Sequence, residues 1–186
     1  MLLNGVRRAA IAQARPDGGC EKESAMAVSL RARMDLVSDP RNLDASVEEV
    51  FQLMIGLACR RVSEAPEREP DSVTAVVGFG GLLSGACVFS SGSAAALNIA
   101  GHMAGMKFSE IDDTVKDAVG EICNMLAGAW KGKIPELAAN CGLSVPAVIT
   151  GRDYRLHVQA PEFQLHHIYR CGDTAFEVTI VCDGVQ

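Results

Sequence analysis

The sequence predicts an α+β fold in which long helices pack on a largely antiparallel β-sheet. Residues 44–62 and 113–138 repeat apolar side chains at the spacing of an amphipathic helix. Residues 72–90 contain two β-rich runs around a glycine-rich turn, and residues 147–181 contain a further series of strand candidates. The predicted order is therefore one helix, two strands, two or three helices, and then three or four strands.

Composition and charge narrow the class of protein. The chain has 186 residues, 48% of them hydrophobic, which is enough for one compact domain. Its net charge of −6 argues against a nucleic-acid-binding surface, and no apolar run approaches the ~20 residues that span a bilayer. Seven cysteines without a Cys-x2-Cys pair indicate neither a disulfide framework nor a metal site. These features predict a cytoplasmic protein that binds neither nucleic acid nor membrane.

The N-terminal region divides into a tail and the start of a domain. Residues 1–34 lack sustained periodicity and contain a Pro-Asp-Gly-Gly breaker cluster, so we expect a mobile tail followed by one domain over residues 35–186. The first helix is expected over residues 44–62, capped either by a capping box at Ser46 or by Asp44. A Glu- and Pro-rich surface loop should follow it.

A β-hairpin is expected next, with strands at residues 72–78 and 82–90. The pair Gly78 and Gly80 also suggests part of a phosphate-binding loop, but it enters a strand and no Gly-Lys-Ser/Thr follows. A helix capped near Ser91 should then run to about Ala104. The remaining strand candidates are residues 147–150, 154–158, 165–170 and 175–181.

The long helix over residues 113–138 carries the most distinctive pattern. Ser109 is expected to cap its entry, with Asp112 supporting the first turn. Gly128 and Gly132 allow an alternative in which the helix ends early and a second helical piece covers residues 135–139. Six apolar side chains fall on one side and should face the core: Val115, Ala118, Val119, Ile122, Leu126 and Ala129.

Asp117, Glu121, Asn124 and Gly128 stack on the opposite side of this helix. Asn and Gly are poor choices for a solvated helix face, because each costs roughly 0.5–1 kcal/mol relative to Ala. Missing side chains at Gly120 and Gly128 would let another molecule approach closely. Two interpretations remain: a docking face on which a carboxylate and a carboxamide act together, or an ordinary solvated face with a few suboptimal residues.

The pattern Asp-x3-Glu-x2-Asn at Asp117, Glu121 and Asn124, followed by Pro146, resembles the signature of the CheC/CheX family of chemotaxis phosphatases. The run Gly-Glu-Ile-Cys-Asn-Met-Leu-Ala-Gly is its specific part, and agreement in element order extends over about residues 35–185. The resemblance implies a CheX-type fold and hydrolysis of the aspartyl phosphate of a CheY-like response regulator. The first predicted helix has no Glu-x2-Asn pair, so one site is expected.

The resemblance also implies a role for each motif residue. Asn124 would orient the attacking water, Glu121 would pair with a lysine of the receiver domain, and Pro146 would shape the strand behind the helix. No cofactor is expected on this chain, because Mg²⁺ would lie in the partner receiver domain. A homodimer joined at sheet edges is also implied. Further contacts with the partner are expected from Asp117, Gly120, Gly128 and Lys131.

Two other functions remain open. The same helix could recognise a receiver domain or a flagellar switch component without catalysis, because fold does not fix function. A small-ligand-binding domain would need a pocket, for which His157, His166 and Tyr169 are candidates. The four histidines have no partners at metal-ligand spacing, and adjacent His166 and His167 should point to opposite faces of a strand.

Overall fold

The computed structural model describes residues 34–64, 69–154, 156–157 and 161–185. The predicted tail, residues 1–34, lies outside this part of the chain except for Met34. No helix within the described residues is both long and apolar enough to cross a membrane. In chain order the elements are α2 (Met34–Val37), α3 (Pro40–Met54), β1 (Cys59–Val62), β2 (Asp71–Gly81), β3 (Leu83–Gly92), α4 (Ser93–Ala104), α5 (Asp113–Gly132), α6 (Pro135–Asn140), β4 (Cys141–Leu143), β5 (Ala147–Arg152), β6 (Phe163–Cys171) and β7 (Thr174–Val185).

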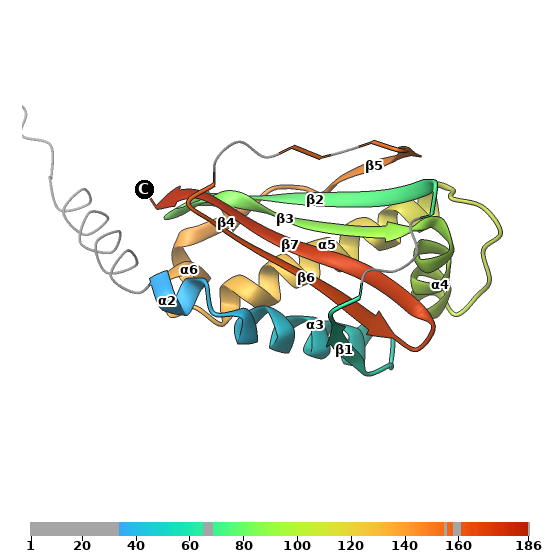
Figure 1. Cartoon of the computed structure of the whole chain (residues 1–186), viewed down its shortest axis with the longest axis horizontal. Helices are drawn as coiled ribbons and strands as arrows, with labels where there is room; N and C mark the ends of the chain where they lie inside the picture. The colour runs from blue at the N-terminus through green and yellow to red at the C-terminus, as the bar shows by residue number, and fades with distance from the viewer. Residues whose placement is uncertain (1–33, 65–68, 155, 158–160, 186) are drawn as a thin grey trace, which may run out of the picture.

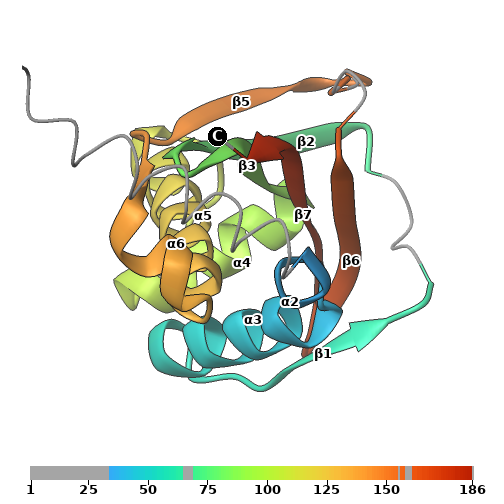
Figure 2. The same cartoon turned by 90° about the vertical axis from the view of Figure 1, so that its left-hand side faces the viewer.

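The strands form one seven-stranded antiparallel sheet that curves around the helices (Figures 1 and 2). The strand order is β1-β6-β7-β3-β2-β4, and β5 pairs with β2 beside β4. Helices α3, α4 and α5 lie in the hollow of the sheet, with α5 between β5 and α3 (Figure 2). The predicted α+β fold with a largely antiparallel sheet is confirmed.

The first long helix, α3, begins and ends earlier than the sequence pattern suggests. Asp39 caps it, because its side chain accepts a hydrogen bond from the backbone N–H of Arg41, and Pro40 occupies the first helical turn. Soon after the helix ends, Gly56 has a φ of 72°, in the left-handed region that favours glycine and stops helices. The prediction of a helix over residues 44–62 is therefore wrong at both ends.

Residues 59–62 form the edge strand β1 instead, paired with β6. The two suggested caps lie inside α3. The Ser46 hydroxyl donates to the carbonyl of Asn42 at 2.7 Å, and the Asp44 carboxylate accepts a hydrogen bond from the Tyr169 hydroxyl at 2.8 Å. The pairing of β1 with a strand from the other end of the chain is tertiary, so local spacing did not reveal it.

The predicted hairpin is confirmed as β2 and β3, and β5, β6 and β7 confirm three of the four later strand candidates. The candidate at residues 154–158 is wrong in its described part, where no residue lies in a strand. The chain turns at Asp153, which has a φ of 50°. Tyr154 then folds over the sheet, and its hydroxyl donates to Oγ1 of Thr74 at 2.7 Å.

The core lies between the sheet and the helices. Alternate residues of the central strands face it, as a half-buried antiparallel sheet requires. The ring of Phe176 stacks on Phe51 of α3 at 4.4 Å between centroids and on Phe89 of β3 at 5.2 Å, which ties helix to sheet. The inward side chains of β2 and β7 are Val73, Ala75, Val77, Phe79, Phe176, Val178, Ile180 and Cys182.

Helix α5 is capped by Asp112, whose carboxylate accepts from the backbone N–H of Val115 at 2.9 Å. The expected cap at Ser109 is therefore wrong. The helix ends at Gly132, and α6 starts afresh with Pro135 in its first turn. The alternative of two helical pieces is thus confirmed, and one continuous helix over residues 113–138 is wrong.

Candidate functional site

One side of α5 is exposed and carries the four stacked residues of the sequence pattern. Asp117 and Glu121 are exposed, and Asn124 and Gly128 are half-buried. We call these four residues the motif face. The opposite side is fixed in the core by side chains that have no exposed surface: Val115, Val119, Ile122, Cys123, Leu126, Ala127 and Trp130. The burial of these residues means that α5 presents the motif face from a rigid base.

Glu121 and Asn124 point toward each other from adjacent turns of α5. The Asn124 carboxamide donates from Nδ2 to Oε2 of Glu121 at 3.4 Å. This is a long hydrogen bond in an exposed position, so it is weak, and both groups can exchange it for contacts with another molecule. A carboxylate and a carboxamide therefore lie side by side at the surface.

Gly120 does not belong to this exposed face, which corrects the expectation that it contacts a partner. It is buried, and a Cβ added there would lie 3.3 Å from Cβ of Pro146 and 3.3 Å from Cγ2 of Val148. The glycine is needed because β5 and the residue before it approach the helix closely at this point. Pro146 itself is exposed and immediately precedes β5.

Gly128 and Lys131 lie further along the same side of α5. A Cβ at Gly128 would meet only Cδ1 of Leu143, at an ordinary contact distance of 3.9 Å. The Lys131 ammonium donates to the carbonyl of Ala138 at 2.9 Å, which ties α6 to the end of α5. Lys131 therefore has a contact within the chain as well as a place beside the motif face.

The N-terminal turns of α5 are acidic. The ammonium of Lys116 lies 2.9 Å from Oδ1 of Asp113, and this hydrogen bond and charge hold the pKa of the exposed Asp113 carboxyl below its ordinary value. Asp117 and Glu121 follow on the exposed side. Acceptor groups of this kind suit a cationic side chain on a partner.

Comparison with known proteins shows the family to which the chain belongs. The family model for the chemotaxis phosphatase CheX matches residues 73–167, which include α5 and Pro146. The chain belongs to the CheX family. The CheY-P phosphatase CheX of Thermotoga maritima is 32% identical over 88 residues, which cover 47% of this chain and 57% of that relative. The aligned region thus spans little more than half of the relative's length.

Solved structures of the CheX family share the fold. CheX from Desulfovibrio desulfuricans has a TM-score of 0.64 at 22% identity, with 76% of this chain and 97% of that chain covered. CheX from Vibrio vulnificus has a TM-score of 0.65 at 21% identity, with 78% and 97% covered. A chain of the CheX-CheY-BeF3-Mg²⁺ complex from Borrelia burgdorferi has a TM-score of 0.62 at 18% identity, with 76% and 96% covered.

Sequence reasoning on this CheX-family chain missed the residue that holds the segment before β5. Ser144 joins the segment before β5 to β2, because its backbone N–H donates to the carbonyl of Gly78 at 2.9 Å. The Ser144 hydroxyl also accepts from the Gly78 N–H at 2.9 Å. Only Pro146 marked this segment in the sequence, and nothing local indicated what Ser144 contacts.

His167 belongs to a polar cluster on the helix side of the sheet. Oδ1 of Asp44 accepts from the Tyr169 hydroxyl at 2.8 Å and lies 3.1 Å from Nδ1 of His167. Arg61 pairs with the other oxygen of Asp44 at 3.2 Å. Burial lowers the pKa of His167, outweighing the opposing effect of the Asp44 charge. The cluster joins α3, β1 and β6 and has a structural role in the fold.

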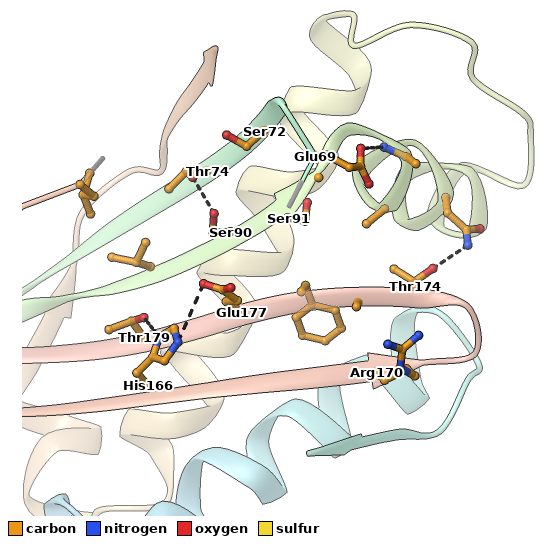
Figure 3. Close-up of a pocket in the computed structure, with 18 of the residues that line it drawn as sticks. Glu69, Ser72, Thr74, Ser90, Ser91, His166, Arg170, Thr174, Glu177 and Thr179 are labelled. Carbon is orange, nitrogen blue, oxygen red and sulfur yellow. Dashed lines mark hydrogen bonds and ion pairs between the residues drawn. The ribbon is translucent and has the colours of Figure 1, made fainter. Parts of the chain in front are cut away.

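His166 faces the other side of the sheet, so the prediction that the two histidines point in opposite directions is confirmed. Its Nδ1 lies 2.9 Å from Oγ1 of Thr179, at the edge of a hollow of about 1020 Å³ (Figure 3). Tyr169 is only 1% exposed and faces the helices, and His157 does not line the hollow. The expected pocket formed by His157, His166 and Tyr169 is therefore wrong.

Proposed function

We propose that this chain is a phosphatase that hydrolyses the aspartyl phosphate of a CheY-like receiver domain. The observation that carries the proposal is the contact between Glu121 and Asn124 on the exposed side of a core-anchored helix. A relative named CheY-P phosphatase and a crystallised CheX-CheY complex support the same activity and partner for this chain. Receiver domains of this kind act in the cytoplasm, so we infer that this chain also acts there.

The proposed reaction takes place at a centre that the partner mostly supplies. The phosphoryl group and its Mg²⁺ belong to the receiver domain. A water oxygen bonds to phosphorus, the bond from phosphorus to the aspartyl oxygen breaks, and aspartate carboxylate and inorganic phosphate result. Catalysis of phosphoryl transfer depends largely on positioning and charge stabilisation, so an added group that orients the water is sufficient to accelerate it.

Asn124 suits the role of orienting this water. Its carboxamide has both a donor and an acceptor, and it keeps one charge state at any working pH. In the free chain the donor contacts Glu121 through a long hydrogen bond, which the partner can replace at little cost. Asn124 thereby completes the partner's catalytic centre without itself forming a covalent bond.

Glu121 suits a docking role. It is exposed, lies beside Asn124 and follows an acidic first turn of α5, so it can pair with a lysine of the receiver domain. Asp117, one turn earlier, would add to the same attraction, and Gly128 leaves room for the partner. We infer a homodimer as well, joined at an edge of the sheet.

The test is the decay of a receiver domain charged with acetyl phosphate in the presence of Mg²⁺. We expect substoichiometric amounts of the full chain to accelerate the release of inorganic phosphate through many turnovers. The alternative, a binding module without catalysis, predicts a complex with the phosphorylated domain and an unchanged rate of phosphate release. A rate equal to that of the receiver domain alone would therefore reject the phosphatase.

A further inference from the structure

Val145 is an apolar side chain left in solvent beside the motif face. It is 86% exposed, which exceeds the exposure of Leu53 on α3 at 73% and of Ile149 on β5 at 40%. Single exposed apolar residues are common on protein surfaces, so exposure alone does not indicate a function. The position of Val145 and the hydrogen bonds that hold its backbone are what indicate a function.

The segment Leu143 to Pro146 runs along the side of α5 that carries Asn124. At one end, Pro146 lies against Gly120, at 3.3 Å from the position of an added Cβ. At the other end, Leu143 lies near Gly128, at 3.9 Å from the corresponding position. Gly120 and Gly128 are one helical turn before and one turn after Asn124, so the segment that carries Val145 passes the turn of α5 that holds Asn124.

The backbone of Val145 is held in place. Ser144 exchanges two hydrogen bonds with Gly78 of β2, each 2.9 Å long, and its hydroxyl donates to the Val145 carbonyl at 2.9 Å. Pro146 restricts the conformation of the residue before it, and a β-branched side chain has few rotamers. Docking on Val145 therefore costs little conformational entropy, as expected of a preorganised contact.

We propose that Val145 is an apolar anchor for the receiver domain whose phosphoryl group Asn124 reaches. This inference rests on the proposed function. A partner that brings an aspartyl phosphate within reach of Asn124 should also cover Val145, because the segment that carries Val145 passes the same part of α5. Glu121 then supplies a polar contact on one side of Asn124 and Val145 an apolar contact on the other, and together they fix the docking angle.

Val145 has no polar side-chain atom, so it acts on binding and not on the hydrolysis step. Val145→Ser should raise the dissociation constant for a beryllofluoride-activated CheY-like receiver domain about tenfold, as expected for losing the burial of one valine. KM for the phosphorylated domain should rise by a similar factor, with kcat within about twofold of wild type. Val145→Ile should bind like wild type. The matched control is Leu53→Ser on α3, a helix on the side of α5 away from β5 (Figure 2), and this change should alter none of these values.

The outcomes separate this inference from the proposed function. If Val145→Ser binds and turns over like Leu53→Ser while wild type is an active phosphatase, the anchor is rejected and the proposed function stands. If wild type binds the receiver domain without hydrolysis and Val145→Ser binds more weakly, the anchor stands and the phosphatase is rejected. If wild type binds no activated receiver domain, both are rejected. Val145→Thr, which keeps the shape of valine, should show a smaller loss of affinity if Val145→Ser proves unstable.

Discussion

Substitutions at two glycines of α5 give a matched test of how closely β5 packs on this helix. Both Gly120 and Gly128 lie in the helix interior, where replacing Gly with Ala gains about 0.8–1.0 kcal/mol of helix propensity. At Gly128 the new Cβ would meet one atom, Cδ1 of Leu143, at 3.9 Å, which is an ordinary contact. Gly128→Ala should therefore raise the free energy of unfolding by about 0.5–1 kcal/mol.

Gly120→Ala should not show this gain. Its Cβ would lie 3.3 Å from both Pro146 and Val148, so the strand or its side chains must move by a few tenths of an ångström. Overpacking of this kind costs about 1–3 kcal/mol, which equals or exceeds the propensity gain. We expect Gly120→Ala to be less stable than Gly128→Ala by at least about 1 kcal/mol.

Thermal and urea unfolding of wild type and both variants would measure this difference. For a domain of this size, 1 kcal/mol corresponds to a shift of about 2–4 °C in Tm. We expect Gly128→Ala to be more stable than wild type, and Gly120→Ala to be as stable as wild type or less stable. If both variants were stabilised equally, the close packing of β5 on α5 at Gly120 would be refuted.

Two further predictions concern Glu121 and His167. Glu121→Gln removes the charge of the side chain and keeps its shape. It should therefore weaken binding of the phosphorylated receiver domain and make the affinity less dependent on salt. If wild type and Glu121→Gln bound the receiver domain with equal affinity at low salt, a contact between Glu121 and a cation would be excluded. Because burial lowers the pKa of His167, the unfolded chain binds a proton first as the pH falls through about 6.5. The free energy of unfolding should therefore fall between pH 7.5 and 5.5 more steeply in wild type than in His167→Asn, and parallel profiles in chemical denaturation would contradict this assignment.

The motif face could be predicted because its information is local. The spacing of Asp117, Glu121 and Asn124 places them on one side of any helix, and the apolar residues between them identify the buried side. Local composition also found the hairpin of β2 and β3, in which a glycine-rich turn joins two runs of β-forming residues. Local sequence patterns were sufficient for these features.

Features that depend on distant partners could not be predicted. Gly120 lies near the motif face on a helical wheel, but Pro146 and Val148 cover it, and no pattern within α5 shows this. Residues 59–62 continue an apolar and basic pattern that fits a helix, and only pairing with β6 makes them a strand. Ser109 was expected to cap α5 and Asp112 only to support its first turn, but the Asp112 backbone is extended and its carboxylate accepts from the Val115 N–H, so Asp112 is the cap.

The most direct test of the central claim compares turnover and binding in Asn124→Ala. Because Asn124 would orient the attacking water, its removal should lower kcat on the order of 10²-fold or more, as for the loss of one positioned polar group in other active sites. The dissociation constant for a beryllofluoride-activated receiver domain should stay within a few-fold of wild type, since Glu121 and Val145 remain. Normal turnover by Asn124→Ala would contradict the account.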